Sequence, residues 1–189
     1  MADQHIEIRP ITEDEWPDWE RSAARAFGEH SDPVMQAFIR SITEIERILD
    51  DFQNGRVVGS AAPHTFELTV PGARVPYPFV DIVTVQPTHR IRGPLIRIMR
   101  QQMEDFRERG EFVTGLTASE SSIYSRYLWG IAVWGEDWSI SREHTIMSCA
   151  PAPSGETRFV DPDEMRQIWL GVYDRVRRDR GSMFNISDG

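Results

Sequence analysis

Lysine is absent from this chain, and all 21 basic side chains among its 189 residues belong to arginine. The protein therefore has no lysine of its own that could be modified. It has one cysteine, Cys149, which excludes an internal disulfide and a cysteine-based metal cluster. No two histidines have the spacing that is typical of a zinc site. These absences predict a protein without redox chemistry and without a metal.

Long apolar runs are also missing. None approaches the ~20 residues that cross a bilayer, and residues 1–7 have neither the basic nor the apolar region of a signal peptide. We therefore expect a cytoplasmic protein that does not bind a membrane. A net charge of −9 argues against nucleic acid and suits a cationic small molecule or a peptide amine, although a solvated acidic surface alone gives the same charge. A hydrophobic content of 40% is enough for one compact domain.

The first half of the chain carries local signals for helices and antiparallel strands. Thr12 and Glu15 have the spacing of a capping box, which predicts a helix from there toward Phe27. The dipeptide Asn54-Gly55 between two apolar runs predicts a tight hairpin. In chain order, the predicted elements are a strand at 6–8, the helix that ends near 27, a second helix from 33, a hairpin over 47–60, and strands at 66–70 and 79–85.

The segment 83–95 is the most informative part of the sequence. A β-rich run ends at a proline, and a basic turn that contains Gly93 then opens an amphipathic helix. Backbone N–H groups at the start of a helix carry partial positive charge, and Arg90 and Arg92 add two full charges beside them. This combination predicts a diphosphate-binding turn between a strand and a helix.

The second half is predicted to continue the sheet and then to change character. The predicted elements are the helix that ends at Gly110, a strand at 112–116, a short helix capped by Ser119 that runs to Tyr127, strands at 131–134, 138–149 and 158–160, and an amphipathic helix over 162–178. Proline and small residues at 150–155 predict a domain boundary. Trp129, Trp134 and Trp138 are expected in core or sheet packing, because no basic stripe accompanies them.

Four separated blocks in this order resemble those of GCN5-related N-acetyltransferases, and more closely the N-terminal part of the Eis-type (enhanced intracellular survival) acetyltransferases. The blocks are 12–17 (TEDEWP), 68–72 (LTVPG), 85–93 (VQPTHRIRG) and 118–124 (ASESSIY), with Trp129-Gly130 behind the last. The resemblance implies an α+β fold of the GNAT type, in which helices flank a mixed, mostly antiparallel, splayed sheet. It implies an acetyl-CoA-binding domain over 1–150, a linker over 151–157 and the start of a second GNAT-like domain over 158–189. The chain therefore resembles a fragment or a short form.

Acetyl-CoA is the cosubstrate that this resemblance implies. Its pantetheine arm would lie along the strand 82–85 and its diphosphate on the N–H groups of residues 90–95. The implied cofactor-binding residues are Val83, Val85, Arg90, Ile91, Arg92, Gly93 and Leu95. Pro94 departs from the pattern because it removes one N–H group, although proline suits the first turn of a helix.

The resemblance also implies roles in catalysis and substrate binding. Tyr124 matches the tyrosine that acts as general acid toward the thiolate of coenzyme A in Eis-type enzymes. Glu29 matches an acidic position that contacts the cationic substrate, and Ile82 is placed beside it in the substrate site. Eis-type proteins use their terminal carboxylate as the base after further domains, so the base in this chain is left open.

Several alternatives stay open at this point. The acetyl acceptor is either an aminoglycoside-like polyamine or a peptide lysine. A rival function is a non-catalytic acyl-CoA-binding or assembly module, and another is transfer of a longer acyl group. The apolar face of the helix over 162–178 has no obvious partner, which is why we also expect that a homo-oligomer can form.

Overall fold

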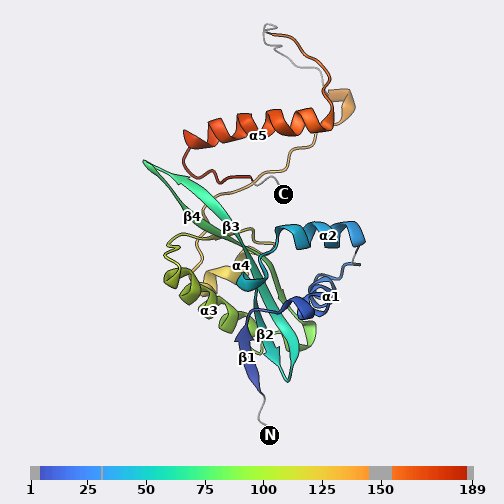
Figure 1. Cartoon of the computed structure of the whole chain (residues 1–189), viewed down its shortest axis with the longest axis vertical. Helices are drawn as coiled ribbons and strands as arrows, with labels where there is room; N and C mark the ends of the chain where they lie inside the picture. The colour runs from blue at the N-terminus through green and yellow to red at the C-terminus, as the bar shows by residue number, and fades with distance from the viewer. Residues whose placement is uncertain (1–4, 31, 145–154, 187–189) are drawn as a thin grey trace.

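The computed structural model describes residues 5–30, 32–144 and 155–186, and its centre is one mixed five-stranded sheet (Figure 1). The strands lie in the order β1-β2-β3-β4-β5, with bounds Ile6–Arg9, Leu49–Gln53, Arg56–Val70, Ala73–Val85 and Gly115–Leu116. Neighbouring strands are antiparallel, except that β5 is parallel to β4. The α-helices are α1 (Trp16–Phe27), α2 (Pro33–Ile42), α3 (Pro94–Glu108), α4 (Ser121–Tyr124) and α5 (Pro162–Arg178). This arrangement confirms the predicted α+β class and the mostly antiparallel sheet.

Short-range sequence signals place the N-terminal elements. The Thr12 N–H donates to the Glu15 carboxylate at 2.8 Å, which confirms the capping box before α1. Asp32 caps α2 by accepting a hydrogen bond from the Val34 N–H. The two-residue turn Asn54-Gly55, with φ of 50° and 73°, joins β2 to β3 as predicted.

The strands β3 and β4 form one hairpin that is longer than the separate pieces predicted from sequence. They stay paired from Gly59–Val85 to Val70–Ala73, and Pro71-Gly72 makes the turn. Near its open end the hairpin is part of the sheet. Farther out it extends beyond β2, and residues 66–77 are called the hairpin tip below.

Helices cover both faces of the sheet, and each face has its own apolar cluster (Figure 1). On the side of α1 and α2 the cluster contains Ile11, Trp19, Ile45, Ile48, Phe52 and Ala62. On the side of α3 it contains Leu49, Ala61, Val80, Ile98, Met99 and Phe106. Neighbouring strand residues alternate between the two clusters, as the period of two in a strand requires.

Two glycines let neighbouring elements approach the sheet closely. A Cβ on Gly59 would lie 3.1 Å from side-chain carbons of both Pro94 and Ile98, so the bare glycine lets the start of α3 sit on β3. A Cβ on Gly115 would lie 1.6 Å from the hydroxyl oxygen of Tyr77. Only glycine therefore allows β5 to pair beneath that phenol ring.

Several predicted elements are corrected by the structure. The strand expected at 112–116 is reduced to two residues, and Phe112 is 77% exposed. The short helix begins after Glu120, so Ser119 is not its cap. No strand forms in the described residues of 131–144 or at 158–160, and Trp134 and Trp138 are exposed rather than packed. The remainder of the strand predicted at 138–149, including Cys149, lies outside the described residues.

The C-terminal part of the chain contacts the hairpin tip. Backbone hydrogen bonds join residues 182–185 to residues 67–69 of β3, and the Tyr173 hydroxyl in α5 donates to the Phe184 carbonyl at 2.9 Å. The Phe184 ring lies among Phe66, Tyr77 and Phe79, with centroids 5.1–5.9 Å apart. The predicted helix over 162–178 is therefore confirmed, and it lies beside the tip rather than against the sheet (Figure 1).

Candidate functional site

The parallel strands β4 and β5 separate soon after they meet. They pair only through Phe79–Gly115 and Val80–Leu116, and β4 continues to Val85 with no strand paired to that edge in the described residues. At the point of separation β4 carries a bulge, in which Ile82 and Val83 oppose the single residue Ala61. Ile82 has a φ of 49°, a strained value for a β-branched residue. The result is a splayed sheet with an unpaired strand edge facing the gap.

The edge of residues 81–85 offers what an extended ligand needs. An unpaired strand edge presents N–H and C=O groups to which an elongated molecule can bond as an added strand does. The side chains of Ile82 and Val83 pack into the clusters on the two opposite faces, which fixes the backbone between them. The hydrogen bonds of Gln86 to Val58 and to Ser22 anchor the end of the strand.

The predicted basic turn follows directly. Gly93 caps α3 with a φ of 91°, no side chain caps the helix, and the first intrahelical bond runs from the Arg97 N–H to the Gly93 carbonyl. The N–H groups of Leu95 and Ile96 are therefore unpaired donors at the positive end of the helix. Arg90 and Arg92 are exposed, and no carboxylate pairs with either in the described part of the chain.

A partly buried ion pair fixes this turn to the sheet. Arg97 Nε donates to the fully buried Asp51 carboxylate at 2.7 Å, and its Nη1 reaches the Arg92 carbonyl at 3.3 Å. A Cβ on Gly93 would lie 3.0 Å from that guanidinium, so the turn folds over Arg97 without room for a side chain. The site thus has a strand edge, free helix N–H groups and two unpaired cations, which together suit an extended ligand that carries an anionic group.

Tyr124 lies in α4, half-buried, with its ring 6.4 Å from that of Trp129 in an edge-to-face arrangement. Burial, with a smaller contribution from the negative charge of Asp81, raises the pKa of Tyr124 above its ordinary value. The phenol therefore keeps its proton at neutral pH. The dependence on Asp81 brings Tyr124 and the bulged end of β4 into one electrostatic environment.

A histidine–aspartate pair beside the bulge is a feature that the sequence analysis missed. His64 of β3 points its Nε2 at the Asp81 carboxylate of β4, 3.7 Å away, and its Nδ1 lies 3.0 Å from the Ile42 carbonyl oxygen. Asp81 immediately precedes Ile82. The pair joins strand residues 17 positions apart, and no local pattern marks them; only the register of the hairpin brings them together.

The residues predicted for substrate binding are less closely grouped. Glu29 follows α1 and is exposed, and its backbone N–H donates to the Ala24 carbonyl. Ile82 lies in the bulge itself. The exposed apolar side chains Val34, Met35 and Phe38 of α2 lie in the same part of the chain as Glu29. No contact joins Glu29 to the strand edge in the described residues.

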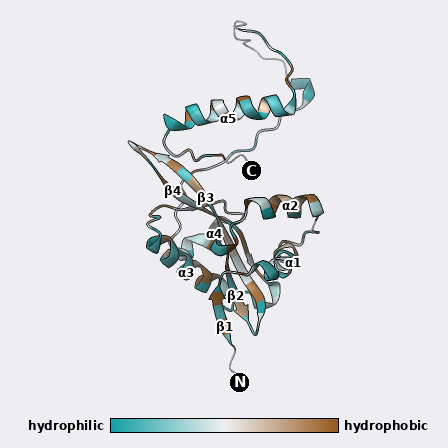
Figure 2. Ribbon diagram, viewed as in Figure 1, coloured by the Kyte–Doolittle hydropathy of each residue, from teal (hydrophilic) through white to brown (hydrophobic). Residues whose placement is uncertain are grey.

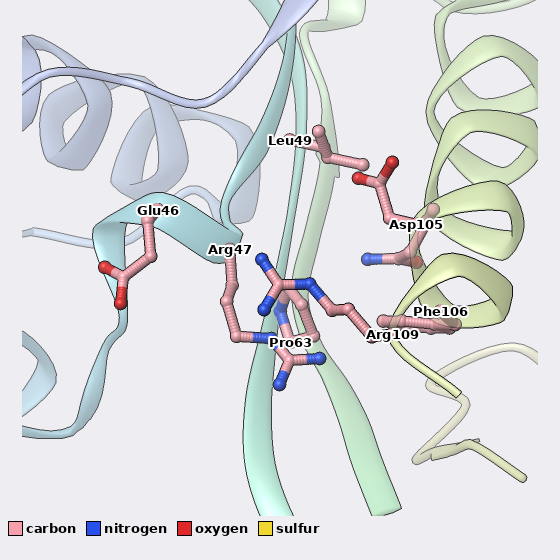
Figure 3. A pocket seen from close by; sticks show the side chains of 8 residues that line it. Glu46, Arg47, Leu49, Pro63, Asp105, Phe106 and Arg109 are labelled. Atoms are coloured by element: carbon pink, nitrogen blue, oxygen red, sulfur yellow. The ribbon is translucent and has the colours of Figure 1, made fainter. Parts of the chain in front are cut away.

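Two hollows elsewhere in the molecule do not compete with this site. One lies between η2 (Ile45–Arg47), β3 and the end of α3, with a volume of about 10 Å³, room for about one water molecule (Figure 3). The other, of about 310 Å³, is a shallow hollow beside Phe106 and Phe112 at the opposite end of α3 from the basic turn. Within the described residues no three acidic, histidine or cysteine side chains form a metal-binding group.

Comparison with known proteins agrees with the geometry. The model of the acetyltransferase (GNAT) domain matches residues 7–132. An uncharacterized N-acetyltransferase of Streptomyces avermitilis is 35% identical over 180 residues, which are 92% of this chain and 43% of that protein. N-acetyltransferase Eis of Mycobacterium tuberculosis is 32% identical over 177 residues, 88% of this chain and 44% of that protein.

A solved structure shows the same arrangement. The crystal structure of Eis1 from Mycobacterium abscessus superposes with a TM-score of 0.60 at 36% identity, covering 67% of this chain and 32% of that one. The chain spans less than half the length of the curated relatives that it matches. No helix in the described residues has the length and apolar character to cross a membrane.

Proposed function

This chain belongs to the acetyltransferase (GNAT) family, and we propose that it moves the acetyl group of acetyl-CoA to a primary amine. The observation that carries the proposal is the continuity of the unpaired β4 edge with the basic turn at the start of α3. A strand edge followed by free helix N–H groups suits a molecule with an extended amide-containing arm and a diphosphate.

Cofactor binding is assigned to backbone more than to side chains. The pantetheine amides would bond to the edge around Val83 and Val85, and the diphosphate would accept hydrogen bonds from the turn between Ile91 and Leu95. Arg90 and Arg92 would add charge. Pro94 costs one donor, but the N–H groups of Leu95 and Ile96 remain available.

Acetyl transfer would then depend mainly on how the amine and the thioester are positioned. Holding an amine against the thioester removes much of the entropic barrier, roughly 7–11 kcal/mol in favourable cases. When bound, acetyl-CoA supplies the activated acyl group. The role proposed for Tyr124 is to donate its proton to the departing thiolate, for which a phenol that is neutral at pH 7 is suited.

The amine is proposed to enter from the side of α1 and α2. Glu29 there would attract a cation, and Ile82 would contact the substrate beside the acetyl group. An aminoglycoside-like polyamine and a peptide lysine both have the required ammonium group. We also propose that residues 158–189 begin a second GNAT-like domain and that homo-oligomers form through the exposed face of α5.

Thiol release tests this function. Purified chain is mixed with acetyl-CoA and, in parallel, with aminoglycosides, polyamines and lysine peptides, while calorimetry measures acetyl-CoA binding separately. We expect binding and amine-dependent release of free thiol. Binding without release for any amine would favour the alternative of an acyl-CoA-binding module, and release only with longer acyl-CoA would favour the other alternative.

A further inference from the structure

We infer that His64 and Asp81 together accept the proton that the amine must lose before it attacks the thioester. The inference rests on the proposed acetyl transfer, and it names the base that the sequence left open. An alkylammonium group has a pKa near 10, so an acceptor beside the acetyl group speeds the reaction at neutral pH.

The hydrogen-bond geometry fixes the state of the histidine. The Ile42 carbonyl oxygen, 3.0 Å from His64 Nδ1, can only accept, so Nδ1 carries the hydrogen. In the neutral ring Nε2 therefore presents a lone pair toward the Asp81 carboxylate, 3.7 Å away. Two acceptors face each other across a gap with no proton between them. This arrangement favours the uptake of one proton.

Asp81 is the member that a substrate can reach. Its side chain is 59% exposed, whereas that of His64 is 10% exposed. One Asp81 oxygen accepts the Ile82 N–H at 2.8 Å, which holds the carboxylate in place, and the other faces His64. Asp81 would therefore contact the ammonium group as the catalytic residue, and His64 would act through it as the positioning residue that stores the proton.

The pair also lies where the acetyl group is expected. Asp81 directly follows Val80, the last residue of β4 that pairs with β5, and precedes the bulge at Ile82. The proposed acid, Tyr124, is close enough for the charge of Asp81 to raise its pKa. An acceptor for the amine and a donor for the thiolate thus lie at the same end of the gap.

The proposed step balances in atoms and charge. The ammonium group gives one proton to the pair, and the neutral nitrogen then attacks the acetyl carbonyl carbon, forming the C–N bond. The C–S bond breaks, the sulfur leaves with the electron pair, and Tyr124 protonates it. The second nitrogen proton returns through water to the tyrosinate. The pair becomes neutral as it takes its proton, which lowers the pKa of Tyr124 and makes it a stronger acid.

The charged groups around His64 set the direction of the pH dependence. Pairing with Asp81 is the largest cause that raises the pKa of His64; burial opposes it, and the Ile42 carbonyl and the charge of Glu44 add to it. The same pairing lowers the pKa of Asp81. Activity requires the unprotonated pair, so it should fall as the pH drops through the raised pKa of His64.

Two substitutions and one control test the pair. Asp81→Asn removes the carboxylate, and His64→Asn keeps a donor for the Ile42 carbonyl but has no counterpart of Nε2. Glu46→Gln removes an exposed carboxylate in η2 that makes no contact with His64 or Asp81 in the described residues, and it serves as the control. We expect Asp81→Asn to lower kcat/KM for the amine about 10²–10³-fold, and His64→Asn at least about tenfold with its acidic limb shifted to lower pH. In both variants the Kd of acetyl-CoA should change less than about twofold, and in the control kcat/KM should also change less than about twofold.

Ring ¹⁵N NMR of the unmodified chain gives a second readout that needs no turnover. We expect the Nδ1–H tautomer for neutral His64 and a titration that moves to lower pH in Asp81→Asn. The Nε2–H tautomer, or an unmoved titration, would overturn the inference even if His64→Asn fails to fold. If the wild type is active and Asp81→Asn is equally active, the inference about the pair is overturned while the proposed function stands. An inactive wild type would instead overturn the proposed function.

Discussion

The two ends of the β3–β4 hairpin differ in what surrounds them. At the open end, β3 pairs with β2, helices cover both faces, and side chains such as Ile98 and Ala61 are fully buried. At the tip, residues 182–185 and α5 contact the strands (Figures 1 and 2). The apolar side chains Met165, Ile168, Trp169 and Val172 of α5 remain 42–54% exposed.

The two ends of the hairpin therefore have different proposed roles, one in catalysis and the other in holding the C-terminal part of the chain. The proposed site uses the bulge, the splay and the basic turn, all of which belong to the buried end. The tip holds the C-terminal part of the chain through one aromatic cluster, a short run of backbone bonds and the contacts of Glu67 with Arg177 and Asn185. Substitutions at the two ends should therefore have effects of different kinds.

The largest expected effect comes from the ion pair between Arg47 and Glu111. Arg47 donates to both oxygens of Glu111, at 3.0 and 2.8 Å, and to the Thr65 hydroxyl, with the two charged side chains at most 8% exposed. Arg47→Met leaves a buried carboxylate unpaired, so the free energy of unfolding should fall by about 3–5 kcal/mol. Urea unfolding measures this change.

The double variant Arg47→Met/Glu111→Leu sharpens the result. With no charge left unpaired, much of the lost stability should return. Failure of the second substitution to restore stability would show that the pair is needed for more than charge balance, for example to place the start of β5.

The next effect in size concerns the basic turn. Replacing Arg90 and Arg92 by glutamine should raise the Kd of acetyl-CoA about tenfold, equivalent to about 1.4 kcal/mol, at low salt and less at high salt, because exposed charges are screened. Arg100→Gln, an exposed arginine farther along α3, is the matched control. Equal losses in both variants, or a loss independent of salt, would argue against a diphosphate at the turn.

The smallest expected effect on activity is at the tip. Phe184→Ala removes the ring that lies among Phe66, Tyr77 and Phe79, so hydrogen exchange in α5 should become faster. Global stability should change by about 1 kcal/mol and turnover by less than twofold. A large loss of turnover would mean that the two ends of the hairpin are coupled.

Local signals in the sequence predicted most of the elements around the site. The capping box at Thr12, the Asn54-Gly55 turn and the helix after Gly93 each depend on a few neighbouring residues, and each is confirmed. The pair of His64 and Asp81 depends on the register of two strands, and the bulge at Ile82 on a two-against-one mismatch. Neither has a local signature.

The strands predicted after Trp129 show the opposite limit. Residues 131–134 are all apolar and include β-branched and aromatic side chains, as strands do, yet a strand also needs a paired edge. In the described residues β5 is only two residues long, and the apolar side chains of this segment are exposed. The composition of this segment predicted its preference for strand conformation, but it could not show whether a neighbouring strand was available to pair with it.

The most direct test of the account compares two tyrosines that lie one helical turn apart. Tyr124→Phe removes the proposed acid, whereas Tyr127→Phe removes a hydroxyl from a half-buried ring that packs on the cluster beneath α3. With thiol release as the readout, we predict that Tyr124→Phe lowers kcat about 10²-fold with the Kd of acetyl-CoA unchanged, and that Tyr127→Phe stays within about twofold of wild type. Equal activity in the two variants would contradict acetyl transfer with Tyr124 as the acid.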